Sequence, residues 1–368
     1  MNYYYSLEKL LNKAATGVSL SKAEIIYLLA LSRDEEIAKL FEVARELRHR
    51  YFGDKVFLYG FLYFSTWCRN KCNFCYYRHS NSLCKRYRKT NSQLLKAAAD
   101  LTQSGVHLLD LTMGEDPFYY NKEYGFEPLL NLVKRIKKET CLPIMISFGA
   151  TPDEVLRKLP EVGADWYACY QETYNEKIYR QLRPGQSFGD RLEKKYKAVK
   201  LGLLIEEGIL TGVGESLTDI GNSMEAMSNI GAHQVRVMSF IPQRGTPMSD
   251  FPPPPQIREL VIIAVLRLLF PHRLIPASLD VHGINGLKQR LEAGANVVTS
   301  LILPHSEMMG VAQSTLNISE GYRTVKGITP VLNKLGLTKA GLDDYISWID
   351  CEKKTLINKY YFSERYIV

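Results

Sequence analysis

The sequence contains no apolar run long enough to cross a membrane. Its most apolar stretches, Val56–Phe64 and Leu260–Leu266, are far shorter than the roughly 18 residues that a spanning helix needs. The first residues also lack a basic segment followed by an apolar one, so no signal peptide is expected. These absences predict a cytoplasmic protein with no membrane partner.

A strong excess of charge of one sign is absent as well. Lys and Arg number 47 against 39 Asp and Glu, which gives a net charge of +8 over 368 residues. The basic residues gather only briefly, in Lys85–Lys89, and a run of that length is typical of a solvated surface. We therefore expect no nucleic-acid partner. A hydrophobic share of 46% excludes global disorder.

Paired cysteine motifs of the kind that hold structural zinc are missing. The chain has seven cysteines, an odd number, and without a secretory signal they do not predict a disulfide framework. A single Cys-x-x-Cys occurs. A reducing compartment is the simplest expectation.

The first 50 residues read as helices. Apolar residues recur at helical spacing between Leu7 and Ala44. Ser21 and Ser32 are expected to cap the second and third helices. We expect residues 1–50 to form N-terminal helices packed on a larger domain, which spans residues 51–368.

From residue 56 onward, short apolar runs alternate with helical stretches. The expected helices include Ser92–Gln103, Glu127–Lys138, Pro152–Leu159 and Ile257–Phe270. The alternation predicts a parallel sheet, most simply an α/β fold of the TIM-type (β/α)8 barrel class with a C-terminal helical segment. A doubly wound open sheet is the alternative. The expected strands are VFLYGFLYF from Val56, VHLLDLTM from Val106, LPIMIS from Leu142, DWYACYQE from Asp165, EGILTGVG from Glu207, QVRVMSF from Gln234, LIPASLD from Leu274 and NVVTSLI from Asn296.

Three cysteines, Cys68, Cys72 and Cys75, follow the first expected strand. Thiolates this close in sequence indicate a soft metal or a cluster that holds them. Structural zinc sites have four ligands, whereas three cysteines suit a 4Fe-4S cluster with one open iron. The other cysteines lack ligand spacing and are expected to be small core residues: Cys84, Cys141, Cys169 and Cys351.

The pattern Cys-x3-Cys-x-aromatic-Cys resembles the radical S-adenosylmethionine superfamily. The resemblance implies a 4Fe-4S cluster whose open iron binds the amino and carboxylate groups of S-adenosylmethionine. It also implies that one electron from the cluster yields a 5′-deoxyadenosyl radical, chemistry that belongs to the cofactor. Phe74, the aromatic residue of the motif, would lie near the adenine.

Further elements resemble cofactor-binding motifs of this superfamily. Met113-Gly114-Glu115-Asp116 resembles its Gly-Gly-Glu element, with Met113 at the first glycine position, and the segment Gly208–Glu215 resembles its Gly-x-Ile-x-Gly-x-x-Glu element. These elements fall toward the carboxyl ends of expected strands, where barrel active sites are built. A guanidinium offers a bidentate fork for a carboxylate, which makes Arg191, and secondarily Arg183, candidates for the carboxylate of the cofactor. The implied cofactor-binding residues are Phe74, Gly114, Glu115, Glu172, Arg183, Arg191 and Gly212.

Longer stretches between Leu28 and Ser300 resemble the methylornithine synthase family within that superfamily. They are YFGDKVFLYGFLYFSTWC, LDLTMGEDPFYY, YQETY, LRPGQSF, EEGILTGVGE, VRVMSFIPQRGTPM and RLIPASLD. The resemblance implies isomerisation of L-lysine to (3R)-3-methyl-D-ornithine in pyrrolysine biosynthesis. It also implies an electron donor, such as flavodoxin or ferredoxin, as a partner.

A lysine-like substrate carries one carboxylate and two ammonium groups, so a closed cavity needs a cation and acids to match it. The resemblance suggests Arg236 for the carboxylate, Asp110 and Asp280 for the ammonium groups, and Ser278 as a neighbour on the face of Asp280. No catalytic residue is assigned. Asp110 as a cap and Arg236 as the partner of a structural acid remain open.

Two rival functions remain. Another enzyme of the biotin synthase or hydrogenase maturase type would keep the barrel and the cluster but act on a different small molecule. A non-catalytic cluster or zinc protein that binds RNA would leave Glu115, Glu172 and the Gly208 segment without a role.

Overall fold

The computed structural model describes residues 6–121, 123, 125–304, 306–312 and 316–363, and the side chains up to residue 356. Eight parallel strands form one sheet in the order β6-β5-β4-β3-β2-β1-β8-β7. Each of the eight expected strand segments overlaps one of them. The strands are β1 (Lys55–Ser65), β2 (Leu108–Met113), β3 (Ile144–Ser147), β4 (Trp166–Ala168), β5 (Leu204–Thr211), β6 (Gln234–Ser239), β7 (Pro276–Ser278) and β8 (Val297–Leu301).

The sheet curls until its two edges meet. Gln234 of β6 bridges to Leu274, just before β7, and the backbone N–H of Val235 donates to the carbonyl of Leu274 at 3.0 Å. Strand order follows chain order around the ring, and this order excludes the doubly wound open sheet, in which the order reverses. The predicted barrel is confirmed.

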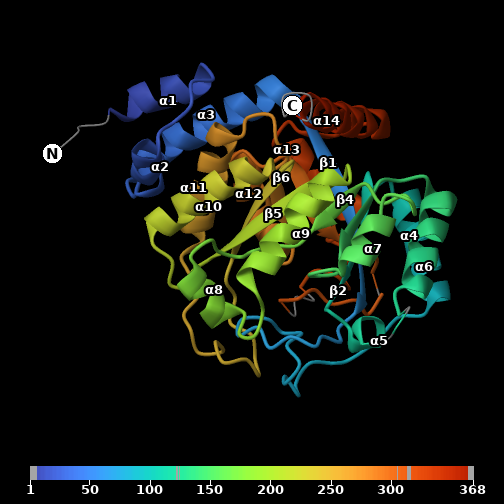
Figure 1. The fold of residues 1–368 in the computed structure, drawn as a ribbon. Coiled ribbons are helices and arrows are strands. Elements are labelled where there is room, and N and C mark those ends of the chain that lie inside the picture. The colour runs from blue at the N-terminus through green and yellow to red at the C-terminus, as the bar shows by residue number, and fades with distance from the viewer. Residues whose placement is uncertain (1–5, 122, 124, 305, 313–315, 364–368) are drawn as a thin grey trace.

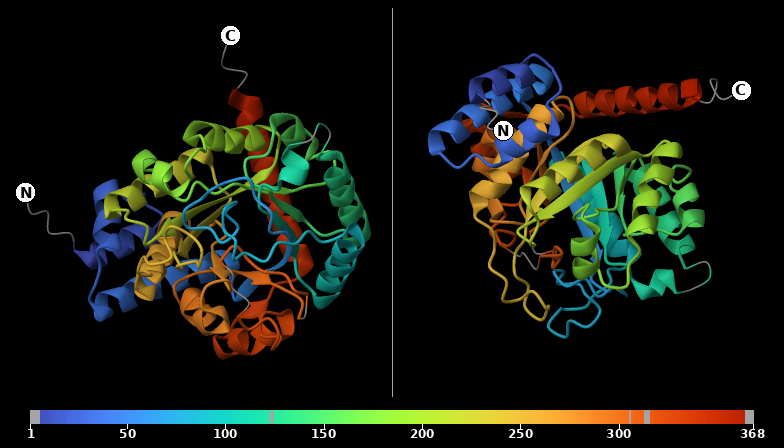
Figure 2. Two further views of the ribbon diagram at one scale, coloured as in Figure 1. Left: turned by 90° about the horizontal axis from the view of Figure 1, so that it is seen from below. Right: turned by 60° about the vertical axis from the view of Figure 1, so that its left-hand side comes forward.

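Helices cover the outside of the barrel (Figure 2). The four expected helical segments agree with α4, α6, α7 and α11 to within two residues. None of the described helices is both long and apolar enough to span a membrane. The outer helices are α4 (Asn91–Ser104), α5 (Pro117–Tyr120), α6 (Glu127–Thr140), α7 (Asp153–Lys158), α8 (Glu176–Leu182), α9 (Phe188–Lys200), α10 (Leu217–Ile230), α11 (Gln256–Leu269), α12 (Gly283–Glu292) and α13 (Val325–Lys334).

The N-terminal segment forms α1 (Leu7–Ala15), α2 (Lys22–Leu29) and α3 (Asp34–Phe52). The predicted cap of α2 is confirmed, because Ser21 and Glu24 bond reciprocally in a capping box. The predicted cap Ser32 is wrong. The N-cap residue of α3 is Arg33 and makes no side-chain cap bond, but three acidic residues occupy the first turn and complement the helix dipole.

Helices α1–α3 pack against the barrel rather than standing apart from it. Arg48 of α3 donates from Nη1 to the carbonyl of Leu291 at 2.7 Å, and Arg45 donates to the carbonyl of Glu292. Leu40 and Ala44 belong to the same hydrophobic cluster as the barrel strands. The division of the chain near residue 50 stays a prediction, and α3 runs two residues past it.

The chain returns to the amino-terminal end of the barrel through β9 (Thr338–Lys339) and α14 (Leu342–Ser363). The short strand β9, which the sequence did not predict, pairs with the start of β1. Tyr345 of α14 lies 2.7 Å, hydroxyl to hydroxyl, from Tyr59, and Trp348 stacks on Trp166. In Figure 1, α14 lies at the end opposite the long loops that follow β1. The amino-terminal end is therefore closed.

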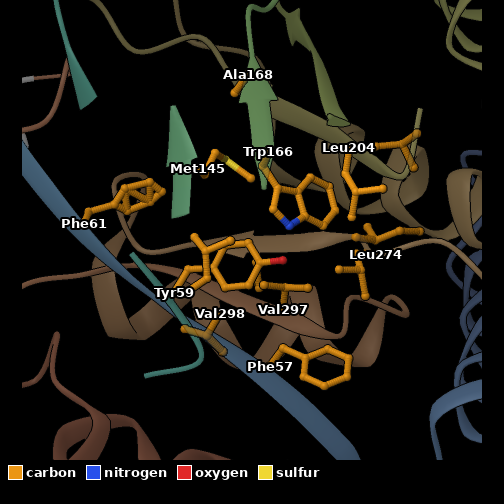
Figure 3. Packing of buried hydrophobic residues seen from close by; sticks show 14 of the residues in the cluster. Phe57, Tyr59, Phe61, Met145, Trp166, Ala168, Leu204, Leu274, Val297 and Val298 are labelled. Carbon is orange, nitrogen blue, oxygen red and sulfur yellow. The ribbon is translucent and has the colours of Figure 1, made fainter. Parts of the chain in front are cut away.

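Large side chains fill the inside of the barrel below the loops. Figure 3 shows Tyr59, Trp166 and Leu204 gathered between the strands, with Phe57 and Val297 beneath them. All five are at most 3% exposed. Fully burying each of the aliphatic side chains contributes about 1.5–3 kcal/mol. Because this half is packed, a binding cavity has room only toward the carboxyl ends of the strands.

Candidate active site

A cavity of about 220 Å³ lies at the carboxyl ends of the strands. Thirteen of the fourteen site residues expected from the sequence line it, including residues that are more than 200 positions apart in the chain. Those thirteen are Cys68, Cys72, Phe74, Cys75, Asp110, Gly114, Glu115, Glu172, Arg183, Arg191, Arg236, Ser278 and Asp280.

Gly212 is the expected site residue that does not line this cavity. It follows β5 with φ +91, and a Cβ there would lie 2.5 Å from the Pro254 ring. Its backbone N–H already donates to Glu215 at 2.9 Å. The positive φ and the nearness of Pro254 explain why glycine stands at position 212 without any cofactor. The role of Gly212 toward a cofactor stays a prediction.

The three clustered cysteines have free thiols. Burial, with a smaller effect from Cys72, raises the pKa of Cys68 to about 12. Burial and then the charges of Cys72 and Cys68 hold the pKa of Cys75 well above its usual range. Three neighbouring thiols lose their protons when they bind a metal, and the metal cation then compensates the negative charges of the thiolates, which would otherwise repel one another. Three thiols match in kind and number the ligands of a 4Fe-4S cluster with one open iron, although the described residues contain no group of three His, Cys, Asp or Glu side chains close enough to hold a single metal ion.

Two side chains donate to the sulfur of Cys72. Arg183 Nη1 lies 3.4 Å from Sγ and Gln186 Nε2 lies 3.0 Å from it. The other end of the Arg183 guanidinium, Nη2, donates to Glu172 Oε1 at 2.6 Å. The guanidinium also lies over the ring of Phe74, 5.3 Å from its centroid. Phe74, Arg183 and Glu172 thus lie side by side next to the cysteine loop.

Glu172 occupies a strained position. Its φ is +69, in a region that non-glycine residues visit rarely, and backbone hydrogen bonds to Gly208 and from Leu210 hold it there. Its second carboxylate oxygen, Oε2, is buried and has no hydrogen-bond partner among the described residues. A buried acceptor of this kind is normally satisfied. A hydroxyl or ammonium group of a bound cofactor would satisfy it.

The β2 end approaches the cysteine loop closely. A Cβ on Gly114 would lie 2.4 Å from the carbonyl oxygen of Trp67 and 2.8 Å from Cβ of Cys68, so only glycine fits. Glu115 accepts from Arg69 Nε at 3.0 Å and from the backbone N–H of Ala150 at 3.0 Å. The carboxylate is thereby fixed at the edge of the cavity.

Arg191 connects this edge to β4. Its Nε donates to the carbonyl of Tyr170 at 2.7 Å, and Nη1 lies 3.7 Å from Glu115 Oε1. Burial by itself lowers the pKa of Arg191, but the neighbouring Cys169 and Glu115 raise it overall. The guanidinium therefore stays charged and faces the cavity.

The opposite wall carries Arg236 on β6. Its Nε lies 2.7 Å from Oε1 of Glu206, close but not aligned as a hydrogen bond. Tyr170 donates to the other oxygen of Glu206 at 2.9 Å, and its ring lies 5.6 Å from the guanidinium carbon. The buried Nη2 of Arg236 has no hydrogen-bond partner within the described chain. It is placed to donate to an anion in the cavity.

Asp110 lies on β2 beside this pair. Burial, followed by the charge of Glu206, raises its pKa from 3.8 to about 7. Thr112 donates to its Oδ1 at 2.8 Å. An acid with a pKa near neutrality can take an ammonium group as a carboxylate or hold a proton in its absence.

Asp280, after β7, sits in a network of its own. Its Oδ2 accepts from the Tyr63 hydroxyl at 2.6 Å and from Ser300 Oγ at 3.0 Å. Arg323 Nη2 donates to Oδ1 at 2.7 Å. The backbone N–H of Asp280 donates to Ser278 Oγ at 3.3 Å, and the role of Ser278 toward a substrate stays a prediction. Asp280 is thus held in place by a cation of the chain itself.

Sequence reasoning missed five of these side chains. The two-residue period of a strand places Glu206 on the same face as Gly208, and Tyr63 on the same face as Phe61. This period could have indicated both residues from the sequence. For Arg323, which reaches Asp280 across 43 positions, the sequence offered no such indication. The missed residues are Tyr63, Tyr170, Gln186, Glu206 and Arg323.

The remaining cysteines divide into two kinds. Cys84 and Cys169 are buried, as expected of core residues. For Cys141 and Cys351 the expectation is wrong, since both are exposed. Cys141 is the C-cap residue of α6 with φ +57, and Cys351 lies on α14. A C-cap and an outer helix face both lie at the surface, which local spacing does not reveal.

Comparison with known proteins agrees with this geometry. Residues 62–227 match the radical SAM superfamily. The chain is 42% identical over 345 residues to a 3-methylornithine synthase of Methanosarcina acetivorans, covering 94% of this chain and 97% of that one. It is also 32% identical over 262 residues to the FeFe hydrogenase maturase subunit HydE of Thermotoga maritima, covering 70% and 74%.

Among solved structures, a crystal structure of methylornithine synthase superposes on this chain with a TM-score of 0.87. The sequence identity is 43%, and the match covers 92% of this chain and 99% of that one.

Proposed function

The chain belongs to the methylornithine synthase family of the radical S-adenosylmethionine superfamily, and from that membership we propose that it isomerises L-lysine to (3R)-3-methyl-D-ornithine in pyrrolysine biosynthesis. The observation that carries the proposal is a single cavity lined by three clustered thiols and by Arg236, Asp110 and Asp280. A cofactor end and an amino-acid end thus face each other.

The cofactor end uses residues that follow β1, β2 and β4, together with one residue at the end of α8 and one in α9. Cys68, Cys72 and Cys75 would hold a 4Fe-4S cluster, and Glu115, Glu172, Arg183 and Arg191 line the same end of the cavity. When bound, the cluster and S-adenosylmethionine supply a radical that abstracts hydrogen from the substrate. The unpartnered oxygen of Glu172 and the charged guanidinium of Arg191 match the ammonium or hydroxyl groups and the carboxylate of the cofactor.

The substrate end matches the charges of lysine. Arg236 presents a buried N–H without a partner within the described chain, which suits the carboxylate. Asp110, with a pKa raised to about 7, and Asp280 suit the two ammonium groups. Because all three side chains belong to rigid strands or their ends, the bound amino acid keeps one orientation.

The segment 306–312 borders this cavity. Val311 and Ala312 line the cavity, and the N–H of Met309 donates to the Tyr87 hydroxyl at 3.1 Å. The N–H of Tyr76 donates to the carbonyl of Val311 at 3.2 Å. The cysteine loop and this segment therefore contact each other at the border of the cavity, and we propose that together they help to keep water from reactive intermediates.

We also propose an acidic electron donor, such as flavodoxin or ferredoxin. Residues 66–89, which contain the three cysteines, hold seven Lys and Arg and no Asp or Glu. Lys71 and Lys85 are exposed there. A basic surface next to the cluster speeds the encounter with an acidic partner, and added salt weakens that effect.

An anaerobic assay tests the function. Reconstituted protein receives S-adenosylmethionine, a reductant and L-lysine, and mass spectrometry follows 5′-deoxyadenosine and methylornithine. We expect both products. Deoxyadenosine without methylornithine would instead favour a different small-molecule substrate, as in the biotin synthase and hydrogenase maturase relatives.

A further inference from the structure

The three ligand sulfurs differ in the hydrogen bonds that they accept. Cys72 Sγ accepts from Arg183 at 3.4 Å and from Gln186 at 3.0 Å. Cys68 Sγ accepts from the backbone N–H of Asn70 at 3.4 Å, and the backbone N–H of Glu115 also acts on this thiol. Among the described residues, Cys75 has only the backbone N–H of Tyr77 as a donor to its thiol. Cys72 is therefore the sulfur with the strongest donors.

The loop between α8 and α9 fixes Gln186 in this position. Its backbone N–H donates to the carbonyl of Arg183 at 3.1 Å, and the next residue, Ser187, caps α9. The side-chain oxygen of Gln186 faces Arg183 Nη1 at 3.5 Å. Because a guanidinium has donors only, the amide must turn its oxygen to Arg183, and its NH₂ group then faces sulfur.

Donors to a ligand sulfur act on the electron affinity of an iron-sulfur cluster. Reduction adds negative charge that is shared by the sulfurs, so an N–H directed at a sulfur stabilises the reduced cluster more than the oxidised one. Arg183 is already engaged with Glu172, which neutralises much of its charge. Gln186 is the closer donor of the two.

We propose that Gln186 is a positioning residue that acts through Cys72 and raises the reduction potential of the cluster, making the electron easier to deliver. The proposal rests on the proposed function, in that Cys72 must ligate a cluster. It concerns a residue outside the cysteine motif and outside the cofactor-binding elements.

The test is a potentiometric titration of the reconstituted protein, followed by electron paramagnetic resonance without S-adenosylmethionine or substrate. Gln186→Leu removes the donor at similar size, and we expect its redox equilibrium to shift about tenfold toward the oxidised form. That shift equals about 59 mV for a one-electron couple. Gln186→Glu places an acceptor at the same site and is expected to shift further in the same direction.

Gln181→Leu is the matched control, since the side chain of Gln181 is exposed on α8, and it should titrate like the wild type. If the Gln186 variants also titrate like the wild type, the proposal is overturned while the proposed function stands. A wild-type protein without any cluster signal would overturn both. If the leucine variant does not fold, the glutamate variant, which keeps size and polarity, decides the question. If Gln186 had only a structural role, its variants would lose iron, but their reduction potentials would not fall in the order wild type, leucine variant, glutamate variant.

Discussion

The guanidinium of Arg236 lies 2.7 Å from the carboxylate of Glu206, and neither side chain is more than 4% exposed. Tyr170 contacts both partners. A substrate carboxylate bound at Arg236 must therefore share the cation with Glu206. The pair is buried in the barrel interior, and Arg236 is the member of it that lines the cavity.

Arg236→Ala is expected to lower the free energy of unfolding by about 3–5 kcal/mol, because it leaves Glu206 buried without a cation. Urea unfolding followed by circular dichroism measures this loss. Formation of methylornithine should disappear as well, since the substrate carboxylate loses the donor that we propose for it.

The double variant Glu206→Gln with Arg236→Met is the control for that loss. It removes both charges and fills similar space, so most of the stability should return while turnover stays absent. A double variant no more stable than Arg236→Ala would show that the ion pair is not the cause of the loss.

Asp110 should make stability depend on pH. Its pKa is raised from 3.8 to about 7 by burial and by Glu206. Its favourable contribution to the free energy of unfolding is therefore fully present below pH 4 and is lost as pH rises through about 7. Asp110→Asn lacks this dependence. Relative to the wild type, the free energy of unfolding of the variant should rise by on the order of 1–4 kcal/mol between pH 5 and pH 8. Urea unfolding at each pH measures this difference.

The same titration predicts a kinetic effect. An ionised Asp110 attracts an ammonium group, so the KM for L-lysine should fall as pH rises through about 7 in the wild type and change little in Asp110→Asn. An inflection near pH 7 that survives in the variant would assign the titration to another group.

The barrel was predictable because each strand is a short apolar run between helical stretches, such as Val56–Phe64 before α4. Parallel strands buried on both sides need such runs. The position of α14 was not predictable, because the contact between Tyr59 and Tyr345 joins residues 286 positions apart. Ser32 failed as a cap because acidic residues one turn further on can begin a helix without a side-chain cap bond.

The site was predictable where a motif or a strand end marks it. Glu115 and Arg236 follow that rule, since both lie on or directly after strands and line the cavity. Arg323 could not be predicted in this way, because it lies in a segment after β8 that reaches Asp280 only in the folded chain. The contact of Gln186 could not be predicted either, because the local sequence does not distinguish a loop glutamine that donates to sulfur from one that faces water.

Cys72→Ala is expected to abolish cluster binding, because the two remaining thiols cannot complete a three-thiolate site. Iron and sulfide analysis and visible absorption after reconstitution measure the loss, and 5′-deoxyadenosine formation should vanish. Cys351→Ala removes an exposed thiol on α14 and should leave cluster content and turnover unchanged. Full cluster occupancy in the first variant would refute the ligand assignment.

Gly114→Ala tests the close approach between β2 and the cysteine loop. The added methyl would lie 2.4 Å from the carbonyl oxygen of Trp67 and 2.8 Å from Cys68 Cβ, so the loop must move and carry Cys68 with it. Overpacking of this kind costs about 1–3 kcal/mol. We expect a lower melting temperature and reduced cluster content per chain.

Gly189→Ala provides the matched comparison for that variant. Gly189 is the second residue of α9, and a Cβ there meets no atom within 4 Å, so the same substitution should create no clash. Cluster content should equal that of the wild type. If Gly114→Ala binds as much iron and sulfide as Gly189→Ala, the cysteine loop does not need its close contact with the end of β2 to hold the cluster.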